Sequence, residues 1–392
     1  MKTRTVLLVA TLVLAVCVVG CGRKTPDKGP SGPAKPDAKV TLCVLVPTTG
    51  PDAERGKAFI RGLELGINAL GKSVDLTKDA LLVKDIADDP TVGRTTALNI
   101  LESEKPTILL GLPDSRAVQQ LTIDLKRTGV PLLTCTTDDL NLPVMESCIA
   151  RLTHPDSLEL SVLADHLFNE ARARQAIIVA DSNDASSLDL ARAFRTAFQA
   201  RTGAVGDQFS YGPAVNPARL IRMVMRETPD MLFLALNPAQ AVEVIDQARK
   251  ATLTARIAGP NWYTPSDFGS PAADYTSVVT TGRDLTEGWT SPALEQLKRE
   301  RTIAEVAEPL TEAELAGFDA IIILANTLNQ ARTPEDLALA ISQIKDLDGT
   351  RGAIAMHRHR ILTGAVNLLT IDRRSFRLIK HITLDQALKQ AN

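Results

Sequence analysis

Short apolar runs that alternate with amphipathic stretches are the feature of this sequence that most restricts its fold. The run "VTLCVLVP" at 40–47 is almost entirely apolar and rich in valine, which predicts a buried strand. From Ala53 to Leu70, apolar residues recur at spacings of three and four, which predicts an amphipathic helix. Strands that alternate with helices form parallel sheets covered on both faces. The expected fold class is therefore α/β, built on doubly wound parallel sheets.

This alternation runs twice along the chain and predicts two lobes. In the first run, the expected strands lie at 40–47, 80–89, 106–113, 130–136 and 147–153, and the expected helices at 53–70, 91–104 and 115–129, the last stopped by Gly129. In the second run, the expected helices lie at 157–172, 186–202, 217–227 and 238–251, and the expected strands at 176–182, 206–212, 230–237 and 256–262. Beyond Ser291 the pattern predicts two more helices, at 318–331 and 333–347, and two strands, at 364–372 and 376–384.

The first residues have the pattern of an export signal. Lys2 and Arg4 precede an apolar run from Val6 to Val19, which is shorter than the roughly 20 residues of a membrane span and fits a signal peptide. The run ends in "VVGC", which resembles the lipobox of bacterial lipoproteins, where the cysteine is acylated. We therefore expect a lipoprotein signal peptide at 1–20 and lipidation of Cys21. An ordinary secretory signal or an uncleaved anchor is the alternative.

Residues 21–38 are rich in proline, glycine and charged side chains and hold no large apolar residue. Such a segment cannot bury a core, so we expect a disordered tether. The folded part is then expected in the cell envelope, held to a membrane by its lipid and facing the periplasm or the exterior.

The composition argues against nucleic acid as a partner and against a groove that stacks sugars or nucleobases. Without residues 1–20, 42 of the 44 basic residues remain against 46 acidic ones, a net charge of about −4, which gives no basic field for nucleic acid. Aromatic residues make up only 4%, which weakens the idea of a stacking groove for sugars or nucleobases.

Of the three cysteines beyond Cys21, Cys135 and Cys148 are the closer pair for a disulfide, and Cys43 is expected to be a buried thiol.

The segment "GINALGKS" at 66–73 matches the phosphate-binding pattern G-x-x-x-x-G-K-[S/T] in full. That pattern binds phosphate only when a strand precedes it and a helix follows it. Here the motif begins inside the expected helix 53–70 and leads into a strand. Gly71 is instead expected to end that helix as a C′ residue, with Lys72 near the negative end of the helix dipole.

Motifs for bond-breaking chemistry are missing from the sequence. It contains no G-x-S-x-G and no C-x-x-C pattern, and the mature cysteines have no recognisable histidine partner. His357 and His359 are two residues apart, whereas a metal site needs three or four ligands. We therefore expect neither an enzyme nor a metal site or cofactor.

Polar segments follow most of the expected strands. In open α/β sheets, ligands bind beyond the carboxyl ends of the strands, where helix N-termini offer free N–H groups. The segments at these positions carry small hydroxyl, amide and acidic side chains, which suit reversible hydrogen bonding of a small polar solute. Candidate ligand-binding residues in these segments are Asp114, Asn183 and Asn237.

At these residues the chain resembles the type I periplasmic solute-binding proteins of the branched-chain amino-acid-binding ABC-transporter family. The resemblance spans roughly 39–390 and rests on the order and spacing of several weak motifs. They include the opening "TGP" turn and its helix, "DIADDP", "ILLGLPDSRA", "GVPLLTCTTDDL", "RLTHPD" and "GFDAIIILANTL". The resemblance implies two doubly wound lobes joined by a hinge of about three crossovers. The expected lobes are 39–152 plus about 284–355, and 153–283 plus about 356–392.

The resemblance also implies where a ligand would lie, between the two lobes. Ser115, Thr136 and Thr137 match the hydroxyl set that holds a ligand's carboxylate, although the same residues could serve only as helix caps. Asp156 matches the acidic residue at the step into the second lobe.

The sequence departs from the family pattern where specificity is set. Arg55 stands where amino-acid binders often carry an aromatic residue, Ala185 where a Tyr-Gly pair is usual, and Asn261 where an acidic residue often meets the ammonium group. A guanidinium prefers a carboxylate or phosphate. The hypothesis is a polar, anionic solute, with the alternative that Arg55 points to solvent.

The family resemblance implies a monomer that closes around a small polar solute, an amino acid or a related carboxylate or amide, and delivers it to the membrane subunits of an ABC permease. Two alternatives stay open. The chain is either a sensory lipoprotein of the same fold that signals to a partner protein, or a degenerate binder whose cleft has lost its ligand.

Overall fold

The computed structural model describes residues 39–87, 89–135, 148–260, 278–282, 290–356, 365–372 and 375–391. The expected signal peptide and tether, together with His357 and His359, lie outside these residues. Among the helices described, none has the length and apolarity that crossing a membrane requires.

The first sheet contains the five strands expected in the first run of the sequence. They are all parallel, in the order β2-β1-β3-β4-β5. Their bounds are β1 Leu42–Val46, β2 Leu81–Asp85, β3 Ile108–Gly111, β4 Leu132–Thr134 and β5 Ile149–Arg151. Successive strand residues point to opposite faces, so each strand contributes to two separate cores.

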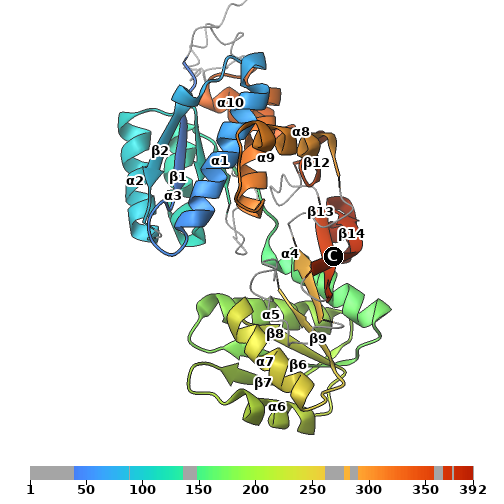
Figure 1. Ribbon diagram of the computed structural model, residues 1–392. Coiled ribbons are helices and arrows are strands. Elements are labelled where there is room, and N and C mark those ends of the chain that lie inside the picture. Colours follow the sequence, from blue (N-terminus) through green and yellow to red (C-terminus); the bar gives the residue numbers. More distant parts are fainter. Residues whose placement is uncertain are drawn as a thin grey trace, which may run out of the picture. The chain divides into compact units, whose positions relative to one another are not determined.

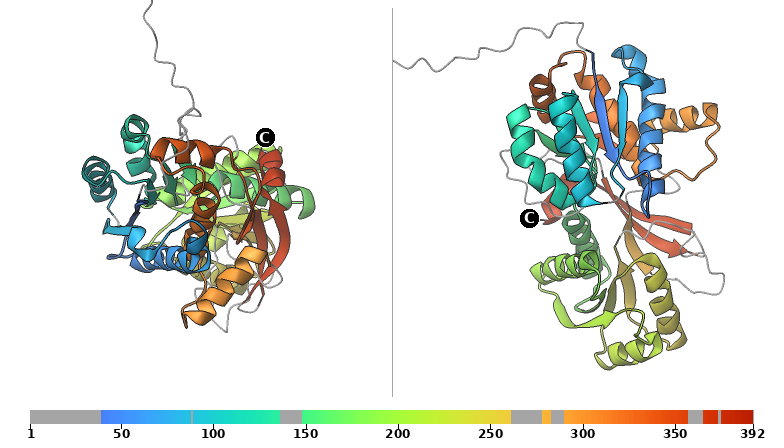
Figure 2. Two further views of the ribbon diagram at one scale, coloured as in Figure 1. Left: turned by 90° about the horizontal axis from the view of Figure 1, so that it is seen from above. Right: turned by 90° about the vertical axis from the view of Figure 1, so that its left-hand side faces the viewer.

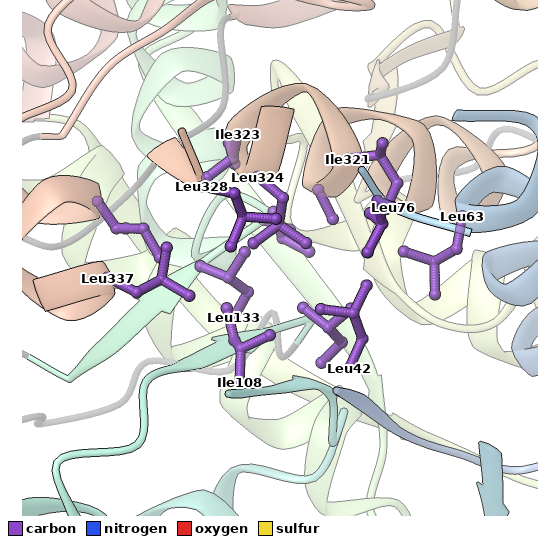
Figure 3. Close-up of a cluster of buried hydrophobic side chains, with 14 of the residues drawn as sticks. Leu42, Leu63, Leu76, Ile108, Leu133, Ile321, Ile323, Leu324, Leu328 and Leu337 are labelled. Carbon is purple, nitrogen blue, oxygen red and sulfur yellow. The ribbon is translucent and has the colours of Figure 1, made fainter. Parts of the chain in front are cut away.

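Helices cover both faces of the first sheet, as the apolar strands predicted. Leu42 and Val44 face α1 (Ala53–Leu70) and α9 (Glu312–Thr327), in the cluster that Figure 3 shows. Cys43 and Leu45 face α2 (Pro90–Ser103) and α3 (Ser115–Thr128). Figures 1 and 2 show α2 and α3 on one side of this sheet and α1 on the other. The doubly wound arrangement is therefore confirmed.

Helix α1 ends where the sequence predicted, but by a different mechanism. The helix stops at Leu70, and Gly71–Ser73 form a short 3₁₀ turn. Gly71 has φ −57°, a right-handed conformation. The prediction that Gly71 ends the helix as a C′ residue, which usually has a left-handed conformation, was therefore wrong. A Cβ at Gly71 would lie 2.3 Å from the carbonyl oxygen of Leu76, so the close approach of the chain requires glycine. At the end of α3, by contrast, Gly129 has φ +72° and is the expected helix stop.

The second sheet is larger and mixed. Its strands run in the order β14-β13-β10-β9-β8-β6-β7. The strands β6 to β10 are parallel, whereas β13 pairs antiparallel with β10 and with β14. The bounds are β6 Gln175–Asp181, β7 Ala204–Tyr211, β8 Met231–Ala235, β9 Arg256–Gly259, β10 Val278–Gly282, β13 Ala365–Asp372 and β14 Ser375–Thr383. The strands of the second run, β6 to β9, are parallel as their pattern predicted. No direction was predicted for the last two strands, β13 and β14, which add an antiparallel ribbon at the edge.

Helices also cover both faces of the second sheet. Phe233 and its neighbours face α4 (Asp156–Asp165), α5 (Ala185–Ala200) and α11 (Leu384–Ala391). On the opposite face, Leu232 packs with α6 (Pro217–Arg226) and α7 (Pro238–Lys250). The helix expected at 157–172 is α4, which a π-helical turn at His166–Glu170 continues.

Several elements were missed by the sequence analysis. They are α8 (Pro292–Ile303), α11, β10 and the hairpin of β11 (Leu347–Gly349) and β12 (Gly352–Ile354), while α10 (Pro334–Ser342) was predicted. Most side chains of helix α8 are polar or charged, and the helix buries only Ala293, Leu294 and Leu297, so its apolar periodicity is weak. Contacts with distant segments stabilise it: Arg301 of α8 and Arg61 of α1 both bind the fully buried carboxylate of Glu314.

Candidate functional site

A small pocket, partly open to solvent, lies at the carboxyl edge of the first sheet. Four strands supply its floor, because each ends at or just before a lining residue: Val46 ends β1, and Pro113, Cys135 and Thr153 follow β3, β4 and β5. The first turns of α1 and α9 supply the walls. Their lining residues are Asp52, Arg55, Gly56 and Phe59 on or beside α1, and Glu312, Ala313 and Ala316 on α9.

The loop between β1 and α1 is held in place by Asp85 at the end of β2. Its carboxylate accepts hydrogen bonds from the Thr49 hydroxyl (2.5 Å) and from the backbone N–H groups of Thr48 (2.8 Å) and Ala87 (2.9 Å). These hydrogen bonds, that from the Thr49 hydroxyl first, hold the pKa of Asp85 well below its usual range. Asp85 therefore fixes the loop that leads to Asp52 and Arg55.

The polar groups of the pocket differ in exposure. Arg55 and Asp52 are exposed on the first turn of α1, at the mouth. Glu312 and Thr153 are buried, with 7% and 2% of their surface exposed. Cys135 is a free thiol, so no disulfide joins it to Cys148. Burial raises the pKa of Cys135 to about 12, although the charge of Arg55 acts in the opposite direction. The pocket thus combines an apolar floor, a mouth with one arginine and one aspartate, and a buried carboxylate.

A buried ionic cluster lies behind Glu312. The Arg351 guanidinium lies 3.6 Å from Oε1 of Glu312 and 3.3 Å from Oδ2 of Asp319, and it donates to the carbonyl oxygen of Leu152 (2.7 Å). Asp319 also accepts a hydrogen bond from the N–H of Thr350 (2.8 Å). The cluster ties α9 to the chain that leaves β5 and to the β11–β12 hairpin.

Of the predicted site residues that the structure describes, Arg55 alone lines this pocket. Asp114 and Ser115 come next to Pro113, but Asp114 caps α3 by accepting from the N–H of Ala117 (2.9 Å), and Ser115 begins that helix. The helix-cap alternative was stated for Ser115, but the residue that caps α3 is Asp114.

Three further predicted site residues that the structure describes lie at helix starts or turns outside this lining. Asp156 begins α4, and Asn237 caps α7 through the N–H of Gln240 (3.0 Å). Asn183 lies exposed in the turn after β6. Thr136, Thr137, Asn261 and Cys21 lie outside the described residues, so their roles stay predictions.

Sequence reasoning missed Asp52, Thr153, Cys135 and Glu312. Thr153 and Cys135 stand directly after expected strands, so the strand-end rule could have found them. Glu312 had no such signal, because it follows a helix and not a strand, and lies far from Arg55 in the sequence. Within the described residues, no group of three or more histidine, cysteine, aspartate or glutamate side chains could hold a metal ion.

Comparison with known proteins identifies the family. A family model described as "periplasmic binding protein" matches residues 39–374. The chain belongs to the periplasmic binding protein family. The family resemblance and the α/β fold expected from the sequence are therefore confirmed. Periplasmic binding proteins act outside the cytoplasm, and the related proteins named below are substrate-binding proteins and not enzymes.

A curated member of similar sequence is Leu/Ile/Val-binding protein homolog 3 of Brucella melitensis, 25% identical over 164 residues. The match spans 41% of this chain and 44% of that protein.

Solved structures of periplasmic binding proteins share the fold along most of the chain. A leucine-binding protein, LivK, from Thermotoga maritima has a TM-score of 0.73 at 16% identity, covering 88% of this chain and 99% of that one. The branched-chain amino-acid-binding protein LivJ from Streptococcus pneumoniae, in complex with isoleucine, has a TM-score of 0.71 at 15% identity and the same coverage. A solute-binding protein from R. palustris, in complex with benzoate, has a TM-score of 0.71 at 17% identity, covering 88% and 98%.

Proposed function

We propose that this protein is a lipid-anchored solute-binding protein that closes two lobes around a small carboxylate-bearing solute and delivers it to an ABC permease. The lobes comprise 39–152 with about 284–355, and 153–283 with about 356–392. The acyl chain on Cys21 and the tether at 21–38 hold the folded part at a membrane surface.

The observation that carries this proposal is the pocket at the carboxyl edge of the first sheet, with Arg55 at its mouth. Ligands of open α/β sheets bind at this edge. A guanidinium binds a carboxylate through two parallel hydrogen bonds, and this favours an anionic head group. Beside it, Val46, Phe59 and Ala316 offer apolar surface for the rest of a small molecule.

The ligands of the related structures support the same class of solute. Those proteins bind leucine, isoleucine and benzoate, and each of these molecules carries a carboxylate. Benzoate has no ammonium group, so the fold can hold a carboxylate with or without an amine. A solute that contacts both lobes would stabilise the closed state by its higher affinity for that state.

Binding to the mature protein, purified in detergent, tests the proposal. A panel would contain leucine, isoleucine, glutamate, benzoate and butyrate, with glucose and adenosine as carboxylate-free controls. A true ligand at a hundred times its Kd should stabilise the fold by about 2.7 kcal/mol and raise the melting temperature. Stabilisation by the controls alone, or by no member of the panel, would contradict the proposed solute class.

Arg55→Ala tests the proposed carboxylate contact. We expect it to weaken binding of the carboxylates by about tenfold or more, the usual worth of one charge-assisted hydrogen bond. Arg116→Ala is the matched control, because Arg116 is also an exposed arginine in the first turn of a helix of the first sheet, but it does not line the pocket. Equal losses in the two variants would exclude a specific role for Arg55.

Two further tests address the anchor and the permease. Cys21→Ala should move the protein from the membrane fraction to the soluble fraction. In cells, loss of the protein should lower uptake of the solute that it binds, and the wild type, but not Arg55→Ala, should restore uptake. Binding without any effect on uptake would favour the sensory alternative.

A further inference from the structure

Helix α6 carries a row of arginines on its outer side. Its inner side packs in the core of the second sheet through the apolar side chains of Leu220, Ile221 and Val224. Residues three and four apart in sequence share one side of a helix. Three exposed arginines with these spacings therefore form one row on the side opposite the core. The α6 arginine row consists of Arg219, Arg222 and Arg226.

The α6 arginine row has no acidic partner among the residues that the structure describes. Helix α6 contains no aspartate or glutamate, and no described acid forms an ion pair with any of the three arginines. Three exposed arginines on α3 and α5, by contrast, each form an ion pair with an aspartate nearby in sequence. These pairs are Arg116 with Asp114, Arg127 with Asp124, and Arg192 with Asp189. The row on α6 is therefore unlike the other exposed arginines of these helices.

Neighbouring acids offset little of this charge. Helix α7 packs beside α6 (Figure 1), and its Glu243 accepts a hydrogen bond from the hydroxyl of Tyr211. Beyond the end of α6, Asp230 accepts from the backbone N–H of Arg174 (2.8 Å). Glu227 is exposed directly after α6 and offsets one of the three charges. The row thus keeps an excess of positive charge.

Two methionines flank the α6 arginine row. Met223 and Met225 are 39% and 37% exposed. With 3.6 residues in each turn, they lie on opposite flanks of the helix, between the arginines and the buried side. Methionine is a flexible apolar side chain that adapts to irregular surfaces. Arginines beside exposed apolar side chains are typical of surfaces that bind the headgroup region of a bilayer.

We propose that the α6 arginine row docks on a membrane that contains anionic lipids and so sets which side of the folded protein faces the bilayer. The guanidinium groups would bind lipid phosphates, and the methionines would enter between the headgroups. The inference goes beyond the proposed function, because it rests on the proposed anchor at Cys21 but not on the solute. That anchor favours a membrane over an acidic partner protein, since it keeps the membrane close to the row.

The anchor also makes a weak surface effective. One arginine near an anionic membrane strengthens binding by about fivefold, and three together by roughly a hundredfold. This gain is modest for a protein free in solution. An acyl anchor turns docking into an intramolecular step, with an effective concentration on the order of millimolar for a short flexible linker. The row then needs only to select one orientation of a protein that the anchor already holds.

Energy transfer tests the inference on the lipidated full-length protein in vesicles. A fluorophore on Ala214→Cys, at an exposed residue two positions before the cap of α6, would report its distance to an acceptor lipid. We expect more transfer in vesicles that contain phosphatidylglycerol than in vesicles of phosphatidylcholine alone. The difference should shrink as salt is added, because salt screens exposed charges. It should disappear when the three arginines of the row are all changed to glutamine.

A matched triple variant controls for net charge. Arg116→Gln, Arg127→Gln and Arg192→Gln together remove the same number of charges from arginines that have acidic partners, and this variant should keep the difference in transfer. Sedimentation of Cys21→Ala with phosphatidylglycerol vesicles at low salt gives a second measure. Changing the α6 arginine row should weaken that binding by about tenfold or more, and the control triple should weaken it less.

The outcomes separate this inference from the proposed function. Equal transfer in both kinds of vesicle, or equal losses in the two triple variants, would overturn membrane docking by α6. Transfer that ignores the lipid, together with cross-links from Ala214→Cys to a protein in cells that need the three arginines, would assign the row to an acidic partner instead. Both triple variants should keep the melting temperature and the solute affinity of the wild type, so the solute-binding function is tested independently.

Discussion

Gly317 of α9 lies against Gly62 of α1, so closely that a Cβ on Gly317 would be 3.1 Å from the Cα of Gly62 and 2.2 Å from the carbonyl oxygen of Phe59. A Cβ on Gly62 would in turn lie 2.1 Å from the carbonyl oxygen of Glu314. The two helices therefore touch through their backbones. Figure 1 shows α1 and α9 side by side although they are far apart in the sequence. This contact positions both walls of the pocket.

Gly317→Ala should destabilise the protein by about 1–3 kcal/mol, because the added methyl group forces the helices apart. This loss of stability should appear even though alanine has a helix propensity about 1 kcal/mol more favourable than that of glycine. Urea denaturation measures the change. Gly93→Ala in α2 is the control, since the nearest atoms to its Cβ would be side-chain carbons, Cδ1 of Leu112 at 3.2 Å and Cδ1 of Ile86 at 3.7 Å. Equal effects of the two variants would contradict the backbone contact.

Asp85→Asn should weaken both the fold and solute binding, because Asp85 holds the loop before α1. The folded-state pKa of Asp85 lies below its ordinary value of 3.8, so its stabilisation is complete above that pH. It is lost as the pH falls through the lower folded-state pKa. Denaturation curves of wild type and variant should therefore differ at neutral pH and converge in acid. Asp79→Asn, at an exposed aspartate in the turn before β2, should leave both properties unchanged.

Cys135 should react slowly with iodoacetamide at neutral pH, because burial raises the pKa of its thiol to about 12 and little thiolate is present. A bound solute should slow the reaction further, since Cys135 lines the pocket. Mass spectrometry of the Cys135 peptide gives the rate, and unfolding in urea should raise it. Cys43, within β1 and fully buried, should show no dependence on solute. Rapid modification of Cys135 in the native protein would show that its thiol is not buried as the structure indicates.

His381 should make the second sheet sensitive to mild acid. It lies on β14, with Nδ1 2.9 Å from Oδ1 of Asn367 on β13, and burial lowers its pKa below 6.5. Its neutral form therefore stabilises the fold fully above pH 6.5, and this contribution is lost as the pH falls through the lowered pKa. In His381→Gln, the free energy of unfolding should change less with pH over this interval. Identical pH dependence of the free energy of unfolding in both proteins would show that His381 does not cause the sensitivity to acid.

Local patterns predicted the regular elements well where apolar residues dominate. The strands of the first sheet, the helix at 53–70 and the stop at Gly129 follow from the spacing of residues that are neighbours in sequence. Helix α8 was missed because most of its side chains are polar or charged and because distant partners such as Glu314 stabilise it. The antiparallel pairing of β13 and β14 was not predicted, because apolar periodicity identifies a strand but not its direction.

The sequence by itself determined that the chain alternates strands and helices and that polar loops follow the carboxyl ends of the strands. Such features depend on periodicity and turn chemistry over a few residues. Only the tertiary structure decided that Glu312 faces the same pocket as Arg55, because α9 packs on α1 through two glycines. It also showed that Asp114 and Asn237 cap helices. Such contacts join residues that are far apart in sequence, and no local pattern encodes them.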